Sequence, residues 1–182
     1  MDDMNDQVFR KVTEDMDPFK KILTRVPGFS GYIERENRRE SDKLIRERLS
    51  QRFRELEGRI SKLQRDFISQ GEIKYVDDLE ATAIKLRTFA DRVRLATRGY
   101  SGLFDAVKIN EAELARLYAH DAAMFDLTDQ MDHAIDNVEA SVGTDGLPAA
   151  IRNLETNARQ SIETFDRREE VFIDASSPST EG

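Results

Sequence analysis

The sequence lacks cysteine and tryptophan, and it contains two histidines among its 182 residues. The absence of cysteine excludes disulfide bonds, thiolate nucleophiles, cysteine-ligated zinc and iron–sulfur clusters. Long hydrophobic runs are also missing, since no segment approaches the roughly 18–20 apolar residues that cross a bilayer. The acidic N-terminus does not have the charge pattern of a signal peptide. These absences predict a soluble, cytoplasmic protein that binds no cofactor.

Hydrophobic residues are scarce and charged residues are abundant. They make up 38% and 35% of the chain, whereas globular domains have about 45–50% and about 25%. This composition is thin for a compact enzyme and is typical of long helices that expose two sides to solvent. It predicts an all-α fold.

The charge is unevenly distributed along the chain, whose net value is −8. Residues 18–98 carry seven more bases than acids, whereas residues 99–182 carry eleven more acids than bases. We expect the basic half to pack beside the acidic half. The alternative is a partner surface, either anionic lipid or an acidic protein. Because the whole chain is acidic, we expect no nucleic-acid binding.

Four segments have the apolar periodicity of long helices, over residues 32–70, 76–98, 110–142 and 148–173. The seam of the first has alternating spacings of four and three, in Leu49, Phe53, Leu56, Ile60, Leu63 and Phe67. The third segment repeats this spacing. Short loops make neighbouring helices antiparallel. The predicted fold is therefore an elongated antiparallel helical bundle of four long helices with coiled-coil-like seams.

Several residues predict where the helices begin and end. Asp17 is a suitable N-cap for a short first helix, and Gly71 is a suitable end for the first long one. Asp77 or Asp78 is expected to cap the second long helix. Asn110 has the offset of a capping box for the third.

A short amphipathic basic helix and loop occupy residues 18–31. The segment from Pro18 to Tyr32 carries three cations and no acid beside its apolar side chains, which suits an anionic membrane surface or a protein partner. The alternative is that this helix folds back and caps the end of the bundle. The candidate membrane or partner contacts are Phe19, Lys20, Lys21, Ile22, Leu23, Arg25, Val26, Phe29 and Tyr32.

The first long helix begins with a polar stretch, residues 34–43, that contains no apolar side chain. A helix that is polar all round is solvated, held by ion pairs or unstable alone. We expect this stretch to project from the bundle or to dock on something polar. The candidate polar partner face is Arg35, Arg38, Arg39 and Lys43.

Asp121 occupies a seam position of the third long helix, where a carboxylate is costly unless it is paired. One interpretation is a buried pair with an arginine across the bundle, which would fix the register of the helices. A second is a hydrated position near the bundle end. A third is a catalytic role, although no second group at a suitable spacing supports it.

Motifs for catalysis and metal binding are missing. The Glu-x-x-His pattern of di-iron bundles fails at both His120 and His133. Asp126, Asp129, Asp132 and Asp136, with His133 beside them, could offer oxygens to a hard cation, but a solvated acidic face opposing the basic first long helix explains them as well. No phosphate-binding glycine loop or nucleophile motif is present. We therefore expect no enzyme, no metal site and no small-molecule substrate.

The predicted organisation is an acidic flexible N-terminus (1–17), the amphipathic segment (18–31), the helical domain (32–173) and a disordered tail (174–182). The function predicted first is a non-catalytic helical scaffold or adaptor that acts through protein–protein contacts or self-assembly. The alternative is a peripheral membrane-surface protein anchored by residues 18–32. A bundle enzyme that binds a small ligand or a metal is a minor alternative.

Overall fold

The computed structural model describes residues 17–96 and 111–176, without the side chains of residues 35, 36 and 169–176. The predictions for residues 1–16, for Asn110 and for residues 177–182 fall outside this part. The described elements are α2 (Pro18–Arg25), α3 (Arg35–Gln70), the 3-10 helix η1 (Ile73–Tyr75), α4 (Val76–Leu95), α6 (Glu111–Ser141) and α7 (Leu147–Ser176).

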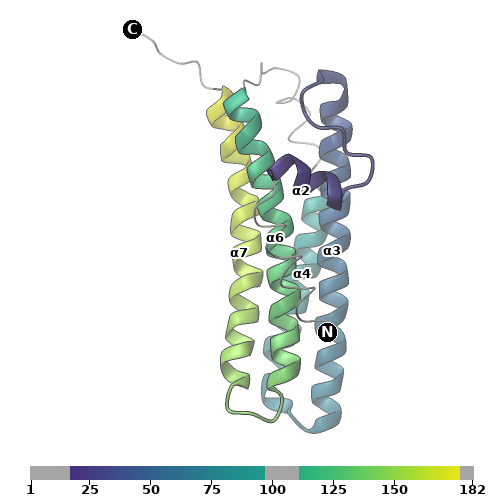
Figure 1. The fold of residues 1–182 in the computed structure, drawn as a ribbon. Helices are drawn as coiled ribbons and strands as arrows, with labels where there is room; N and C mark the ends of the chain where they lie inside the picture. The colour runs from purple at the N-terminus through teal and green to yellow at the C-terminus, as the bar shows by residue number, and fades with distance from the viewer. Residues whose placement is uncertain (1–16, 97–110, 177–182) are drawn as a thin grey trace, which may run out of the picture.

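Four long helices lie side by side in an elongated body (Figure 1). α3 and α4 form one hairpin and α6 and α7 form the other, with α3 packed against α6 and α4 against α7. The short helix α2 crosses α6 near the end of the body that is opposite the two hairpin turns (Figure 1). The described residues include no strand, so the prediction of an all-helical fold is confirmed.

The core runs along the inner faces of the long helices. Every predicted seam residue of α3, from Leu49 to Phe67, is buried. Phe53 of α3, Phe89 of α4 and Phe165 of α7 pack edge to face, with ring centroids 4.8 Å and 5.4 Å apart. Such edge-to-face pairs add about 0.5–1.5 kcal/mol beyond the buried area. These aromatic contacts join the two hairpins.

Two of the predicted helix ends agree with the structure, and the predicted cap of α4 does not. Asp17 caps α2, since its carboxylate accepts a hydrogen bond from the Phe19 amide at 2.9 Å. Gly71 ends α3 in the left-handed conformation, with φ of 80°. The prediction that Asp77 or Asp78 caps α4 is wrong. A 3-10 turn precedes this helix, and both aspartates lie inside its first turn. Their negative charges interact favourably there with the positive end of the helix dipole.

Three helix boundaries also differ by three residues from those predicted. α4 ends at Leu95 rather than at residue 98. α3 begins at Arg35 rather than at residue 32, because Tyr32 belongs to a loop that packs against α6. α7 continues to Ser176, three residues beyond its predicted end.

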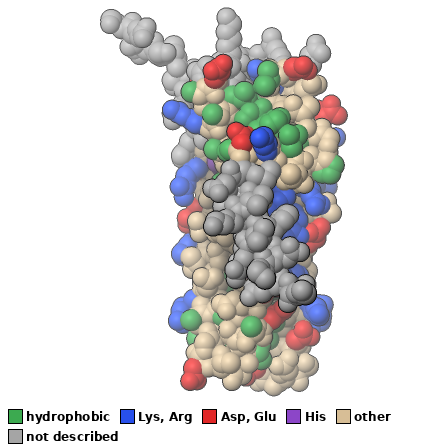
Figure 2. Space-filling model, in the orientation of Figure 1, with side chains coloured by type: hydrophobic (Ala, Val, Ile, Leu, Met, Phe, Trp, Pro, Cys, Tyr) green, Lys and Arg blue, Asp and Glu red, His purple; other side chains and the backbone are tan. Residues whose placement is uncertain are grey.

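Acidic and basic side chains are interspersed over the visible surface of the body (Figure 2). None of the described helices combines the length and the apolar character that a membrane-spanning helix needs.

Candidate functional site

Two aspartates and two arginines are buried together near α2. Asp42 and Arg46 belong to α3, Asp121 to α6 and Arg168 to α7. Asp121 and Arg168 are only 0% and 1% exposed. We call these four side chains, together with the hydroxyl of Tyr32, the buried charge network. It joins three long helices and the loop between α2 and α3.

Arg168 is the centre of the buried charge network. Its Nε and Nη2 donate to the two oxygens of Asp121 at 2.8 Å and 3.1 Å, which is a bidentate pair. Its Nη1 donates to Asp42 Oδ1 at 2.7 Å, and the other oxygen of Asp42 accepts from Arg46 Nε at 2.7 Å. The Tyr32 hydroxyl donates to Asp121 Oδ2 at 2.6 Å. Asp121 therefore makes the buried pair with an arginine that the first interpretation of its seam position required.

The network alters the protonation of its members. Burial alone would raise the pKa of Asp121, but the charge of Arg168, the neighbouring His120 and hydrogen bonds from Arg168 and Tyr32 lower it to about 2. Burial and the charge of Asp121 raise the pKa of the Tyr32 hydroxyl well above its ordinary value. Tyr32 therefore stays protonated and remains a donor, while Asp121 stays ionised and remains an acceptor.

The lowered pKa of Asp121 predicts a contribution to the pH dependence of stability. The carboxyl has a pKa of about 2 in the folded chain against an ordinary 3.8, so this contribution is complete above about pH 4 and is lost as the pH falls through 2. The shift corresponds to about 2 kcal/mol at 1.36 kcal/mol per unit. Between pH 5 and pH 2, the free energy of unfolding of the wild type should therefore fall by about 2 kcal/mol more than that of Asp121→Asn.

Urea titrations at several values of pH across this range measure both slopes. His120 lies beside Asp121 on α6, with its Nδ1 3.7 Å from Asp121 Oδ1. Parallel pH curves for the two proteins would contradict the expected role of Asp121.

The apolar face of α2 is buried against α6. Ile22, Val26, Phe29 and Tyr32 are all buried, and the rings of Phe19, Phe29 and Tyr32 surround the ring of Tyr118 from α6. Of the predicted membrane or partner contacts in this segment, Lys20 and Leu23 are exposed, the latter by 42%. In this arrangement, the segment lies against α6 with its apolar face buried.

Gly31 makes this close contact with α6 sterically feasible. Its φ is 94°, and a Cβ at this position would lie 2.8 Å from the hydroxyl oxygen of Tyr118. That hydroxyl accepts a hydrogen bond from the backbone amide of Tyr32, in the same loop, at 2.9 Å. A larger residue at position 31 would displace Tyr118 from this contact.

The cations of α2 and α3 pair with the acidic residues of α6. Lys21 lies 2.9 Å from Asp126, and Arg25 lies 2.6 Å from Asp129. Arg59 of α3 reaches Asp132 and Asp136, each at 2.6 Å. Burial would lower the pKa of Arg59, but the hydrogen bonds that Arg59 donates to Asp136 and Asp132 raise it above its ordinary value.

These ion pairs explain the acidic cluster of α6 without a bound cation. All four aspartates that were considered as oxygen ligands face a lysine or an arginine from the basic half of the chain. In the part of the chain that the structure describes, no group of three or more acidic or histidine side chains is placed to hold a metal ion. The packing of the basic half against the acidic half is the arrangement that the charge distribution predicted.

The polar stretch at the start of α3 packs in part against the rest of the body and does not project from it along its whole length. Ser41 and Asp42 are buried, and the Ser41 hydroxyl donates to the carbonyl oxygen of Gly31 at 2.8 Å. Of the predicted polar partner face, Arg38 donates to the Tyr32 carbonyl oxygen at 2.6 Å, Arg39 is exposed, and Lys43 lies 3.8 Å from Glu47. The side chain of Arg35 is outside the described part.

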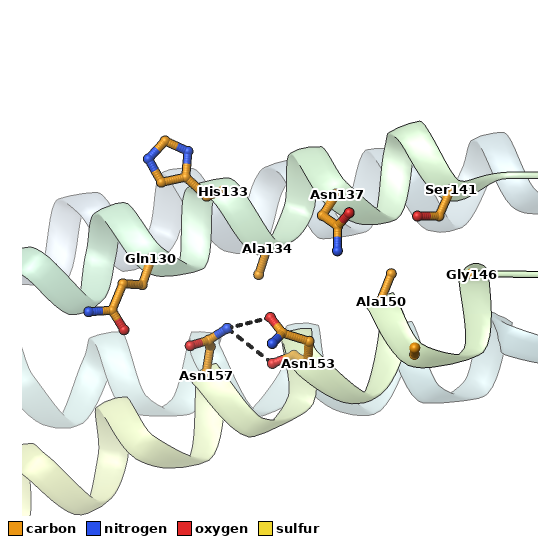
Figure 3. A pocket seen from close by; sticks show the side chains of 10 residues that line it. Gln130, His133, Ala134, Asn137, Ser141, Gly146, Ala150, Asn153 and Asn157 are labelled. Atoms are coloured by element: carbon orange, nitrogen blue, oxygen red, sulfur yellow. Dashed lines mark hydrogen bonds between the residues drawn. The ribbon is translucent and has the colours of Figure 1, made fainter. Parts of the chain in front are cut away.

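A shallow groove of about 660 Å³ follows the line between α6 and α7 near their connecting turn (Figure 3). Ala134 and Ala150 lie at its floor and are buried. Amide side chains line it, and the amide nitrogen of Asn157 donates to Asn153 Oδ1 at 2.8 Å. His133, although it borders the groove, points away from it in Figure 3.

Sequence reasoning missed Asp42, Arg46 and Arg168, although the heptad spacing carried a signal for each. Counting back from Leu49 by three and then by four reaches Arg46 and Asp42. Counting forward by three from Phe165 reaches Arg168. The three charges therefore lie at seam positions, where apolar residues are the usual occupants. When charged residues occupy seam positions on several helices, they are candidates to pair with one another in the core.

Compared with known proteins, the chain matches no family model, no curated protein and no solved structure.

Proposed function

We propose that this chain is a non-catalytic helical scaffold or adaptor that acts through protein–protein contacts. The observation that carries the proposal is that acidic side chains of α6 form ion pairs with cations of other helices. Asp121 is bound by Arg168, and the four aspartates of α6 face cations of α2 and α3. These ion pairs link α6 to α2, α3 and α7, and such links between helices are what a rigid scaffold needs.

The finer architecture belongs to the same proposal. We interpret the body as an antiparallel four-helix bundle with coiled-coil-like seams, because the buried residues of α3 keep the spacing of four and three. Such a bundle offers long, straight outer faces that a partner protein can bind. Its exposed large apolar side chains, including Ile68, Ile73 and Ile84, are available to such partners.

The membrane-surface function is the second candidate, and it requires α2 to leave α6. The basic and apolar composition of residues 18–32 supports it. Its cost is the exposure of the aromatic contacts with Tyr118 and the loss of the Lys21–Asp126 and Arg25–Asp129 pairs. The scaffold proposal therefore expects α2 to remain on α6 in the presence of lipid.

Flotation with anionic and neutral vesicles separates the two candidates. We compare the wild type with the double variant Asp126→Asn and Asp129→Asn, which removes the Lys21–Asp126 and Arg25–Asp129 pairs and leaves the composition of α2 unchanged. The scaffold proposal expects neither protein to float. Salt-sensitive flotation of the wild type, increased in the double variant, would favour the membrane function and contradict the proposal.

A positive test of the scaffold function is stoichiometric binding. The full chain should form a defined complex, with itself or with another protein, that can be rebuilt from purified components and is lost in a folded surface variant. The control is a variant with the same substitution on another face and an unchanged melting temperature. If purified chain neither self-associates nor captures a stoichiometric partner, the proposal is wrong.

A further inference from the structure

His120 joins α6 to α7 beside the buried charge network. Its side chain is only 10% exposed, and its Nε2 lies 2.8 Å from the backbone carbonyl oxygen of Thr164 on α7. A carbonyl oxygen can only accept a hydrogen bond, so Nε2 carries a proton and donates it. In the neutral ring the other nitrogen, Nδ1, is then an unprotonated acceptor.

The Nδ1 atom of His120 is buried and has no hydrogen-bond partner among the residues that the structure describes. Asp121 Oδ1 lies 3.7 Å from it, which is too far for a hydrogen bond but close enough for two charges to interact strongly. In the neutral ring both atoms are acceptors, so they repel each other. A buried acceptor that lacks a donor lowers the stability of the fold.

A second proton on the ring removes this conflict. It turns Nδ1 into a cationic donor beside a carboxylate, while Nε2 keeps its bond to Thr164. Asp121 is ionised wherever histidine titrates, because its pKa is about 2. A shift of less than about 1 Å brings Nδ1 and Oδ1 within hydrogen-bond distance. The bond formed is charge-assisted and is therefore stronger than one between neutral groups.

The described charged groups near His120 come from three helices. They are Arg116 and Asp121 on α6, Glu163, Asp166, Arg167 and Arg168 on α7, and Asp42 and Arg46 on α3, with the neutral hydroxyl of Tyr32 beside them. Arg116 and the first three on α7 are exposed, so water and salt screen their charges. In the buried part, each guanidinium is already bound by a carboxylate. Asp121 is therefore the charge that favours a second proton on the ring.

From this geometry we propose that His120 is a pH-sensitive link between α6 and α7. Below neutral pH the ring carries both protons, binds the Thr164 carbonyl oxygen through Nε2 and Asp121 through Nδ1, and holds the two helices more firmly. Above neutral pH, Nδ1 has no proton and the contact with Asp121 is lost. The link goes beyond the scaffold function, because it acts on the α6–α7 hairpin whichever partner the chain binds.

The pH dependence of stability tests this link. Because the folded chain favours the protonated ring, the contribution is present at pH 5 and is lost as the pH rises to 8. His120→Gln keeps an amide donor for Thr164 but cannot gain a proton. Between pH 8 and pH 5, the folding equilibrium constant of the wild type should rise at least about threefold relative to that of His120→Gln. Urea unfolding at several values of pH measures both constants.

His133 provides the matched control. It is the second of the two histidines in the chain and is exposed. His133→Gln removes the same titrating group from the surface of α6, so this variant should keep the pH dependence of the wild type. Parallel pH curves for the wild type and His120→Gln overturn the inference. A pH dependence that His133→Gln removes, and His120→Gln does not, overturns it as well.

A second measurement uses the wild type and does not depend on the folding of His120→Gln. Nitrogen-15 NMR of the imidazole rings distinguishes the Nε2–H form, the Nδ1–H form and the doubly protonated ring. The chain gives signals from two histidines, and the spectrum of His133→Gln assigns them. We expect the Nε2–H form of His120 at pH 8 and the doubly protonated ring at pH 5. An Nδ1–H ring at pH 8, or a ring with one proton at pH 5, overturns the inference and leaves the scaffold proposal standing.

Discussion

Replacing Arg168 with methionine should lower the free energy of unfolding by about 3–5 kcal/mol, the cost of breaking a buried ion pair by removing one partner. The guanidinium makes a bidentate contact with Asp121 and a further contact with Asp42. Methionine fills much of the same volume, but it leaves the carboxylates of Asp121 and Asp42 buried without Arg168, and Arg46 then contacts Asp42 alone. Urea unfolding followed by far-UV circular dichroism measures the loss.

Arg167 provides the matched control for this experiment. It is the adjacent residue on α7 and is exposed, so Arg167→Met should change stability by no more than about 0.5 kcal/mol. Arg168→Lys should fall between the two, because lysine keeps the charge but loses the planar fork that binds Asp121. Equal stabilities for Arg168→Met and Arg167→Met would show that the buried charge network contributes nothing to the fold.

Ile60→Asp is the second substitution with a large expected effect. Ile60 is fully buried in the seam of α3. Truncating such a side chain costs about 2–5 kcal/mol, and a carboxyl group without a hydrogen-bond partner costs more. We expect a loss of at least about 4 kcal/mol, which is a large fraction of the roughly 5–15 kcal/mol that stabilises a typical domain. Leu56→Asp should act in the same way, since Leu56 is also buried.

The same substitution at the exposed Ile84 is the control, because it makes the same chemical change outside the core. Ile84 lies on α4 and is 51% exposed, so Ile84→Asp should cost about 1 kcal/mol or less. Thermal melts of both variants and the wild type provide the comparison. Similar melting temperatures for Ile60→Asp and Ile84→Asp would mean that the α3 seam does not form the core in solution.

Much of the helical layout could be predicted because it depends on local signals. The spacing from Leu49 to Phe67, the Asp17 cap and the glycine at position 71 act within a few residues of chain, and the structure contains all three. The prediction of the α4 cap was wrong because a 3-10 turn precedes that helix, and such a turn has no comparably strong sequence signal.

The partners of the buried charges could not be predicted with the same ease. Asp121 was recognised as a seam carboxylate, but its arginine is 47 residues away along the chain. Which arginine reaches it depends on how α6 and α7 align in their hairpin, and a periodic pattern within one helix does not contain that information. The apolar stripe of α2 was ambiguous for a related reason, because a stripe that suits a lipid surface also suits the side of another helix.

The sequence separations within the buried charge network have a consequence for the order of folding. Each hairpin closes from segments that are near one another in the chain, whereas Asp42 and Arg168 are 126 residues apart. Contacts over such a distance carry a larger loop-closure cost and form after local ones. Asp121 and Arg168 can pair when the α6–α7 hairpin closes, whereas Asp42 reaches Arg168 only when the two hairpins meet. A docking of the hairpins shifted by one heptad would separate Asp42 from Arg168, so this contact disfavours the wrong alignment at the last step of folding.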